Sequence, residues 1–95
     1  MALKVSQSVL QKLAGKTPPV TVAEIEQCFV NRDGGYLEDT REEHASDPPT
    51  QWFVAETLYG RKLKVAFILR GDEITIRTAY DANSEEIRIY SKYGK

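Results

Sequence analysis

The sequence predicts an α+β fold with two N-terminal helices, an antiparallel β-meander sheet of three to four strands, and a C-terminal helix. Three observations support this prediction. Two amphipathic stretches near the N-terminus each follow a helix-capping residue. From Trp52 the hydrophobic pattern changes to period two, interrupted by glycine-containing turns. A final capping residue then precedes a third helical pattern. Because 95 residues suit one domain, we treat 1–95 as a single domain.

The first helix is expected to begin after Ser6 and to end at Gly15. Its apolar stripe consists of Val9, Leu10 and Leu13. The prolines that follow cannot continue a helix, because proline lacks the backbone N–H. The sequence therefore predicts a separate second helix beyond them.

That second helix has a clear start, where Thr21 and Glu24 form a capping box. Its inward face is expected to carry Val22, Ile25, Cys28 and Phe29. Cys28 is more readily interpreted as a small buried hydrophobic residue than as a reactive thiol, because no neighbour in sequence would lower its pKa.

The middle of the chain is less regular. A turn is expected at 33–35, a short strand at 36–41 and a loop at 42–51, which contains two prolines. Strands are then predicted at about 52–59, 62–70 and 73–80. Gly60-Arg61 and Gly71-Asp72 are each expected to form a two-residue hairpin turn between them.

Two-residue turns would fix the register of this meander. They pair Leu58 with Leu63, Val54 with Phe67, Trp52 with Leu69, Leu69 with Ile74, Phe67 with Ile76 and Val65 with Thr78. One face is then nearly all apolar, with Glu56 opposite Val65 as the exception. The other face places Ala55, Ala66 and Arg77 in one row, which leaves room for a ligand or for a helix.

The C-terminal helix is expected to begin after Asn83, with Glu86 completing a capping box. Ile87, Tyr90 and Tyr93 recur at helical spacing, with Ile89 beside them. We expect this stripe to pack on the sheet, with a tyrosine hydroxyl available at its rim.

Charge is distributed unevenly along the chain. The net charge of −1 combines +3 over 1–23, −7 over 24–56 and +3 over 57–95. A polyanion would prefer the two ends, although a near-zero total is unusual for a strong nucleic-acid binder. No apolar run reaches the roughly 20 residues of a membrane helix, and no signal peptide is recognisable. A single cysteine cannot form an internal disulfide, which favours the reducing cytoplasm.

Metal-dependent chemistry has little support in the sequence. His44 is the one histidine, and it lies among acidic residues in a loop without recognisable ligand spacing. A solvated acidic loop is the stronger interpretation. No phosphate-binding loop or dinucleotide fingerprint is present. We therefore expect no metal and no cofactor.

RNA cleavage beside a 2′-hydroxyl needs neither a metal nor a protein nucleophile, since the substrate carries its own. The protein must supply cations for the phosphate and groups for proton transfer. Arg77, Lys64 and Arg61 are candidates to bind phosphate. Arg77 could instead pair with Glu85 or Glu86 on the final helix. The candidates for proton transfer are Tyr80, Glu86, Tyr90 and His44.

Several segments together resemble the BrnT-like branch of the RelE/ParE toxin superfamily. They are the helix from Val20-Thr21 through Phe29, the Trp52 strand, Gly60-Arg61-Lys62-Leu63-Lys64-Val65, the turn Arg70-Gly71-Asp72, Ile74-Thr75-Ile76-Arg77-Thr78-Ala79, and a helix containing Glu85-Glu86 and ending near Tyr90. The branch commonly has an arginine where this chain has Tyr80, followed by a more basic helix. The resemblance implies a RelE/BrnT-like fold, a metal-independent endoribonuclease that inhibits translation, and a small DNA-binding antitoxin as partner.

Two hypotheses follow from the sequence. The first is a RelE/BrnT-like toxin or toxin relative that cleaves RNA. The second is a non-catalytic protein-interaction module on the same small α+β fold, which would bind a protein partner through its acidic middle or an exposed sheet face. The near-neutral charge favours the second, and the resemblance favours the first.

Overall fold

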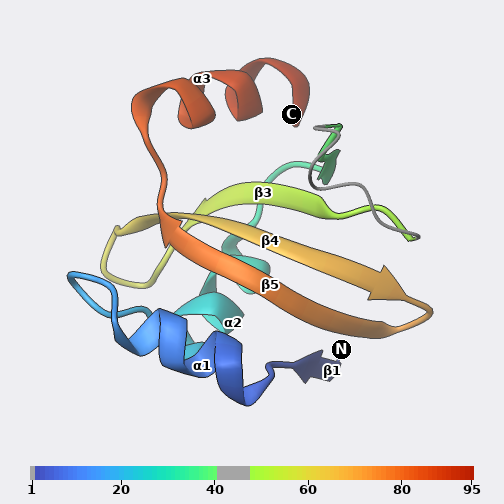
Figure 1. Cartoon of the computed structure of the whole chain (residues 1–95). Coiled ribbons are helices and arrows are strands. Elements are labelled where there is room, and N and C mark those ends of the chain that lie inside the picture. The colour runs from blue at the N-terminus through green and yellow to red at the C-terminus, as the bar shows by residue number, and fades with distance from the viewer. Residues whose placement is uncertain (1, 41–47) are drawn as a thin grey trace.

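The computed structural model describes residues 2–40 and 48–95, and it shows three helices and a five-stranded mixed sheet (Figure 1). The elements, in chain order, are β1 (Ala2–Lys4), α1 (Gln7–Ala14), α2 (Val22–Asn31), β2 (Leu37–Glu38), β3 (Gln51–Glu56), β4 (Lys62–Arg70), β5 (Glu73–Asp81) and α3 (Ser84–Tyr93). The α+β class, both N-terminal helices and the C-terminal helix are confirmed.

The sheet differs from the predicted meander in one strand. Its order is β1-β5-β4-β3-β2, and β2, β3, β4 and β5 pair in antiparallel fashion. The additional strand, β1, pairs in parallel with β5 at the opposite edge from β2. The pattern did not predict β1 because three residues are too few to display a period of two.

The helix boundaries follow the capping residues closely. The hydroxyl of Ser6 accepts a hydrogen bond from the Val9 N–H, and Gly15 ends α1. Capping boxes are present at both predicted positions, between Thr21 and Glu24 and at the start of α3. Local hydrogen bonding therefore sets where these helices begin, as expected for this motif.

The predicted β3–β4 register is wrong. Glu56 pairs with Lys62, so residues 57–61 form a five-residue connection in place of the two-residue turn. The pairing moves by three residues, which is an odd number and exchanges the two faces of β3 relative to β4. Val54 therefore lies opposite Lys64 rather than Phe67. Glu56 is exposed at the end of the strand, not buried opposite Val65.

The β4–β5 register is confirmed near its turn and wrong beyond it. Gly71-Asp72 forms the expected two-residue connection, and the Leu69–Ile74 and Phe67–Ile76 pairs are present. A register shift between Ala66 and Phe67 then gives β5 one extra residue. From there on Val65 lies opposite Ala79, not Thr78, and the predicted row of Ala55, Ala66 and Arg77 does not exist.

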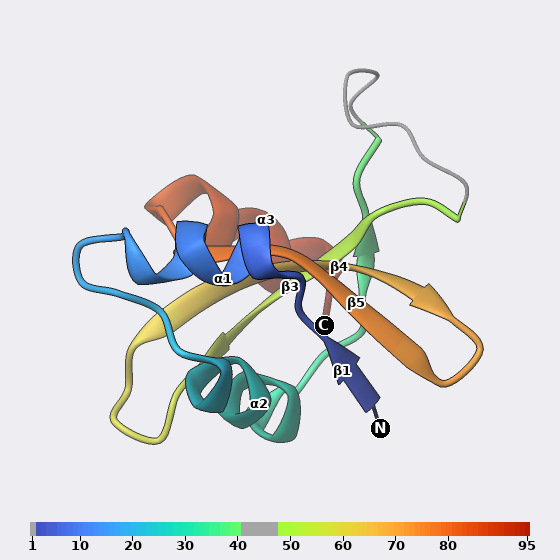
Figure 2. The same cartoon turned by 60° about the horizontal axis from the view of Figure 1, so that its bottom comes forward.

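Helices cover both faces of this sheet. Figures 1 and 2 show α2 and α3 on opposite faces, with α1 close to β5. On the α2 face, the ring of Phe29 lies 4.7 Å from that of Phe53 and 5.5 Å from that of Phe67. On the α3 face, Tyr90 is buried with its ring 6.2 Å from Trp52. Tyr93, by contrast, is 64% exposed, so only part of the predicted stripe packs on the sheet.

Candidate functional site

Three of the candidate residues meet on the α3 face of the sheet. The Glu86 carboxylate Oε2 lies 3.0 Å from the Lys64 Nζ and accepts a hydrogen bond of 2.7 Å from the Tyr80 hydroxyl. The Lys64 ammonium also lies 4.6 Å from the centroid of the Trp52 ring. Lys64 is only 8% exposed, so its charge depends on these partners rather than on water.

The backbone explains why these side chains converge. Lys64 on β4 lies directly opposite Tyr80 on β5, and paired residues share a face of the sheet. Glu86 is the third residue of α3, and its other carboxylate oxygen accepts the Asn83 N–H in the capping box. The same carboxylate thus starts the helix and ties that helix to the sheet.

The protonation states of this cluster follow from its contacts. Burial opposes ionisation of Glu86, but the hydrogen bonds from Asn83 and Tyr80 and the charge of Lys64 outweigh burial and lower the pKa of the carboxyl. Burial and the hydrogen bond to Glu86 raise the pKa of Tyr80, with Lys64 acting in the opposite direction. Near neutral pH the site therefore pairs an ionised Glu86 with a protonated Tyr80 hydroxyl.

A cavity of about 610 Å³ lies beside this cluster. Lys64, Ala66, Thr78 and Tyr80 form part of its wall from β4 and β5. The remaining lining residues come from the segment containing α1, from positions flanking 41–47, and from β5: Ser6, Val9, Lys12, Asp39, Thr50, Thr75, Ile76 and Arg77. Among the described residues that line it, three are cations and one is a carboxylate, a balance that suits an anionic ligand.

Arg77 lies at the extra residue of β5, where the ladder shifts register. This position lets it line the cavity without standing in the predicted alanine row. The alternative ion pair with the final helix is absent, since Glu86 pairs with Lys64 and Glu85 with Arg88. Across residues 2–40 and 48–95, neither Arg77 nor Lys12 forms an ion pair, so both charges are available to a ligand.

Arg61 lies in a different environment. Its guanidinium contacts Asp81 at 2.7 Å, Glu24 at 3.2 Å and the carbonyl oxygens of Pro19 at 2.7 Å and Pro18 at 2.9 Å. These contacts join the segment before α2, the first turn of α2 and the end of β5. They use the guanidinium donors internally, which is a structural arrangement rather than an open phosphate site.

Of the other two proton-transfer candidates, Tyr90 lies apart from the cluster. The Tyr90 hydroxyl donates a 2.7 Å hydrogen bond to the Gly35 carbonyl, and burial raises the pKa of this phenol. His44 lies outside the described residues, which end at 40 and resume at 48. Burial raises the pKa of Cys28 to about 12, in keeping with the predicted buried, unreactive side chain.

Lys12 is a cationic lining residue that sequence reasoning did not select. It belongs to the basic segment 1–23, which the charge distribution had marked as favourable for a polyanion. Its position could be found only from the fold, because α1 lies beside β5, which begins at Glu73, far along the chain from α1.

Comparisons with protein-family models, curated proteins and solved structures give no match to this chain. Within the described segments, no helix is long and apolar enough to span a membrane. The same segments contain no group of three or more His, Cys, Asp or Glu side chains placed to share a metal ion.

Proposed function

We propose that this protein is a metal-independent endoribonuclease of the RelE/BrnT-like toxin kind, which inhibits translation by cleaving RNA. The observation that supports it best is that Glu86 contacts both Lys64 and Tyr80, which stand in the wall of the cavity that Lys12 and Arg77 also line. The sequence resemblance supports the same activity, and a small DNA-binding antitoxin is the partner it implies.

Each residue of the site has its own role in RNA cleavage. Lys12 and Arg77 bind the RNA phosphates. The 2′-hydroxyl gives up its proton to a solvent water as its oxygen attacks phosphorus, and Arg77 and Lys64 stabilise the negative charge that develops there. Tyr80 donates its proton to the departing 5′ oxygen, since its raised pKa keeps it protonated at neutral pH. Glu86 is a positioning residue that holds the Tyr80 hydroxyl and the Lys64 ammonium in place.

Cleavage of a defined RNA by the purified protein in the presence of EDTA tests this proposal. We expect products that end in a 2′,3′-cyclic phosphate and no cleavage of the same sequence with 2′-deoxy sugars. Tyr80→Phe should slow cleavage by about 100-fold, the usual contribution of one general acid. Arg77→Ala should slow it by at least about tenfold.

Arg70→Ala is the matched control, because Arg70 is an exposed arginine on β4 that does not line the cavity. It should cleave RNA at the unsubstituted rate. Expression of the active protein should arrest bacterial growth, and Arg77→Ala should relieve the arrest. If the folded protein neither cleaves RNA nor slows growth, the ribonuclease proposal fails and the non-catalytic interaction module remains.

A further inference from the structure

The outer edge of β3 is only partly paired. Within residues 2–40 and 48–95, the two residues of β2 pair with Gln51 and Trp52, and no further strand pairs with the rest of that side. Backbone groups of successive residues in a strand point alternately to its two sides. The Thr57 N–H donates to the Arg61 carbonyl on the β4 side, so the backbone groups of Val54 and Glu56 point to the outer edge.

One of these outward groups is already occupied. The Asn31 side-chain amide donates a 2.9 Å hydrogen bond to the Glu56 carbonyl. The N–H and C=O of Val54 and the N–H of Glu56 remain directed toward the edge. Unpaired backbone groups in this arrangement can form hydrogen bonds with an added strand.

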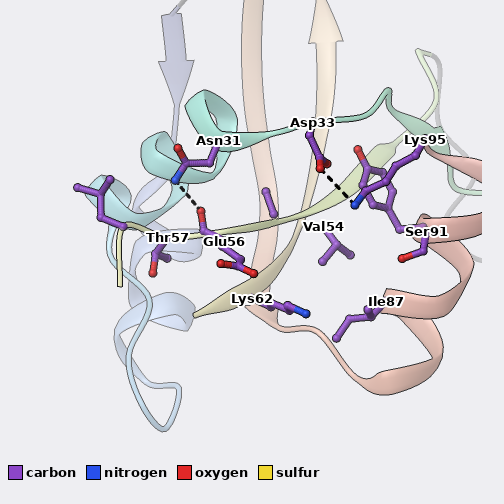
Figure 3. A pocket seen from close by; sticks show the side chains of 12 residues that line it. Asn31, Asp33, Val54, Glu56, Thr57, Lys62, Ile87, Ser91 and Lys95 are labelled. Carbon is purple, nitrogen blue, oxygen red and sulfur yellow. Dashed lines mark hydrogen bonds and ion pairs between the residues drawn. The ribbon is translucent and has the colours of Figure 1, made fainter. Parts of the chain in front are cut away.

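A groove of about 340 Å³ runs along this edge (Figure 3). The second half of β3 forms its floor. Asn31 and Asp33, at and just beyond the end of α2, lie on one side, and Ile87 and Ser91 of α3 lie on the other. The Lys95–Asp33 ion pair, at 3.3 Å, crosses from one side to the other. The groove therefore places an open strand edge between two walls.

We propose that this groove binds an extended segment of a partner protein, which pairs with β3 as an additional antiparallel strand. A residue opposite Val54 would exchange two backbone hydrogen bonds with it. Its side chain would lie on the same face as Val54, beside Ile87, so an apolar residue fits there. The residue two positions earlier would lie opposite the exposed Glu56 carboxylate, where a lysine or arginine fits.

The shape of the edge favours a single strand over a second copy of this chain. A strand recessed between two helices admits an isolated extended segment, whereas another intact sheet edge would bring its own flanking helices. Exposed apolar side chains also lie on the elements that form the groove, and Leu58 itself lines it. Leu58 is 70% exposed and Tyr59 96% exposed in the loop after β3, and Val30 on α2 is 82% exposed.

The binding test uses the acetylated, amidated peptide Thr-Arg-Thr-Val-Thr, added to isotope-labelled full-length protein at up to millimolar concentration. We expect saturable amide chemical-shift changes at Val54 and Glu56 and in the Asn31 side-chain amide. The same peptide with an N-methylated valine should bind at least about tenfold more weakly, because it loses the hydrogen bond opposite Val54.

Two variants at one position separate backbone pairing from charge. Glu56→Pro removes the outward N–H while leaving the β3–β4 ladder intact, since proline is tolerated where the N–H faces away from a partner strand. It should weaken peptide binding by about tenfold or more. Glu56→Gln keeps that N–H and should weaken binding less.

Three outcomes would overturn the proposal: absence of saturable shifts at the groove, equal binding of the N-methylated peptide, or shifts confined to the Lys12–Arg77 cavity. Concentration-dependent dimerisation of the free protein that Glu56→Pro abolishes would assign the edge to a second copy, and would also overturn it. The inference requires no RNA cleavage, so its failure and that of the ribonuclease proposal are distinguishable.

Discussion

Lys64 shows what a buried cation requires of its surroundings. A lysine that is 8% exposed has lost nearly all its hydration, and the carboxylate of Glu86 and the face of Trp52 replace it. Removing one partner from such a pair leaves the other charge poorly compensated. The same contacts that hold Lys64 in the cavity wall therefore also support the α3–sheet contact.

We expect Lys64→Met to lower the free energy of unfolding by about 2 kcal/mol, because Glu86 keeps its charge but loses its cation. Glu86→Gln should cost less, since glutamine still completes the capping box. In the double variant the two losses should not add, and the coupling should be about 1 kcal/mol. Urea denaturation measures each value. Lys62→Met, at an exposed position on β4, is the control. Additive losses in the Lys64→Met/Glu86→Gln double variant would show that the two side chains do not stabilise each other.

The sequence identified the members of this cluster but not their contacts. Tyr80, Glu86 and Lys64 were selected by residue type, and the capping box correctly placed Glu86 in the first turn of α3. The Lys64–Tyr80 pairing could not be foreseen, because it depends on the extra residue that β5 contains near Arg77. Residue type is thus known from the sequence. A contact between residues far apart in the chain can be predicted only when the strand register is known.

At the scale of elements, the β3–β4 connection explains the register error. Thr57 accepts hydrogen bonds at its hydroxyl from the N–H groups of Tyr59 and Arg61, and Gly60 has a φ of 83°. These contacts stabilise a five-residue loop. The apolar pattern could not distinguish the two registers, because α2 and α3 bury both faces of the sheet. A three-residue shift therefore still places apolar residues opposite one another.

The contacts of Arg61 connect α2, β5 and the segment before α2, and their contribution to the free energy of unfolding can be measured. Arg61→Ala should lower the free energy of unfolding by about 3 kcal/mol, since Asp81 and the Pro18 and Pro19 carbonyls lose their guanidinium donor and Glu24 keeps only its bonds from Thr21. Arg61→Lys should be intermediate, because an ammonium cannot reproduce the planar set of donors. Arg88→Ala, at an exposed ion pair, should change stability by less than about 0.5 kcal/mol.

Thermal and urea unfolding provide these values, and RNA binding provides the second readout. If Arg61→Ala has the same free energy of unfolding as the unsubstituted chain but binds RNA more weakly, then Arg61 contacts the RNA rather than holding the elements together.

At the scale of the molecule, three carboxylates give stability a defined pH dependence. Hydrogen bonds from Arg61 lower the pKa of Asp81, and in Glu24 and Glu86 hydrogen bonds and nearby cations outweigh burial to lower it as well. Each group binds its proton more weakly when folded. Their contribution is therefore complete above the unfolded values of 4.5 for glutamate and 3.8 for aspartate, and it is lost as pH falls through the lower folded values.

We expect the free energy of unfolding to vary little between about pH 5 and 7 and to fall progressively below about pH 4.5. Urea denaturation at a series of pH values measures this curve. Glu86→Gln should make the acid slope shallower than Glu85→Gln does, although both remove one carboxylate from the first turn of α3. Stability that increases on acidification below pH 4.5 would contradict the sign of all three shifts.

The overall architecture was predictable where local signals were strong. Ser6, Thr21 and Asn83 marked the three helix starts, and Gly71-Asp72 marked the β4–β5 turn, because each signal involves neighbours in sequence. The parallel β1 strand and the position of α1 beside the cavity depend on contacts between the two ends of the chain. No local pattern specifies such contacts.

The pairing of β1 with β5 has a consequence for the order of folding. Ala2 lies opposite Glu73, so this ladder closes a loop of 71 residues, whereas the β4–β5 hairpin closes across two. Closing the longer loop costs more chain entropy and gains only three residue pairs. We therefore expect β1 to join last and to detach first by local opening, which makes the N-terminal strand the earliest part of the sheet to exchange its amide protons.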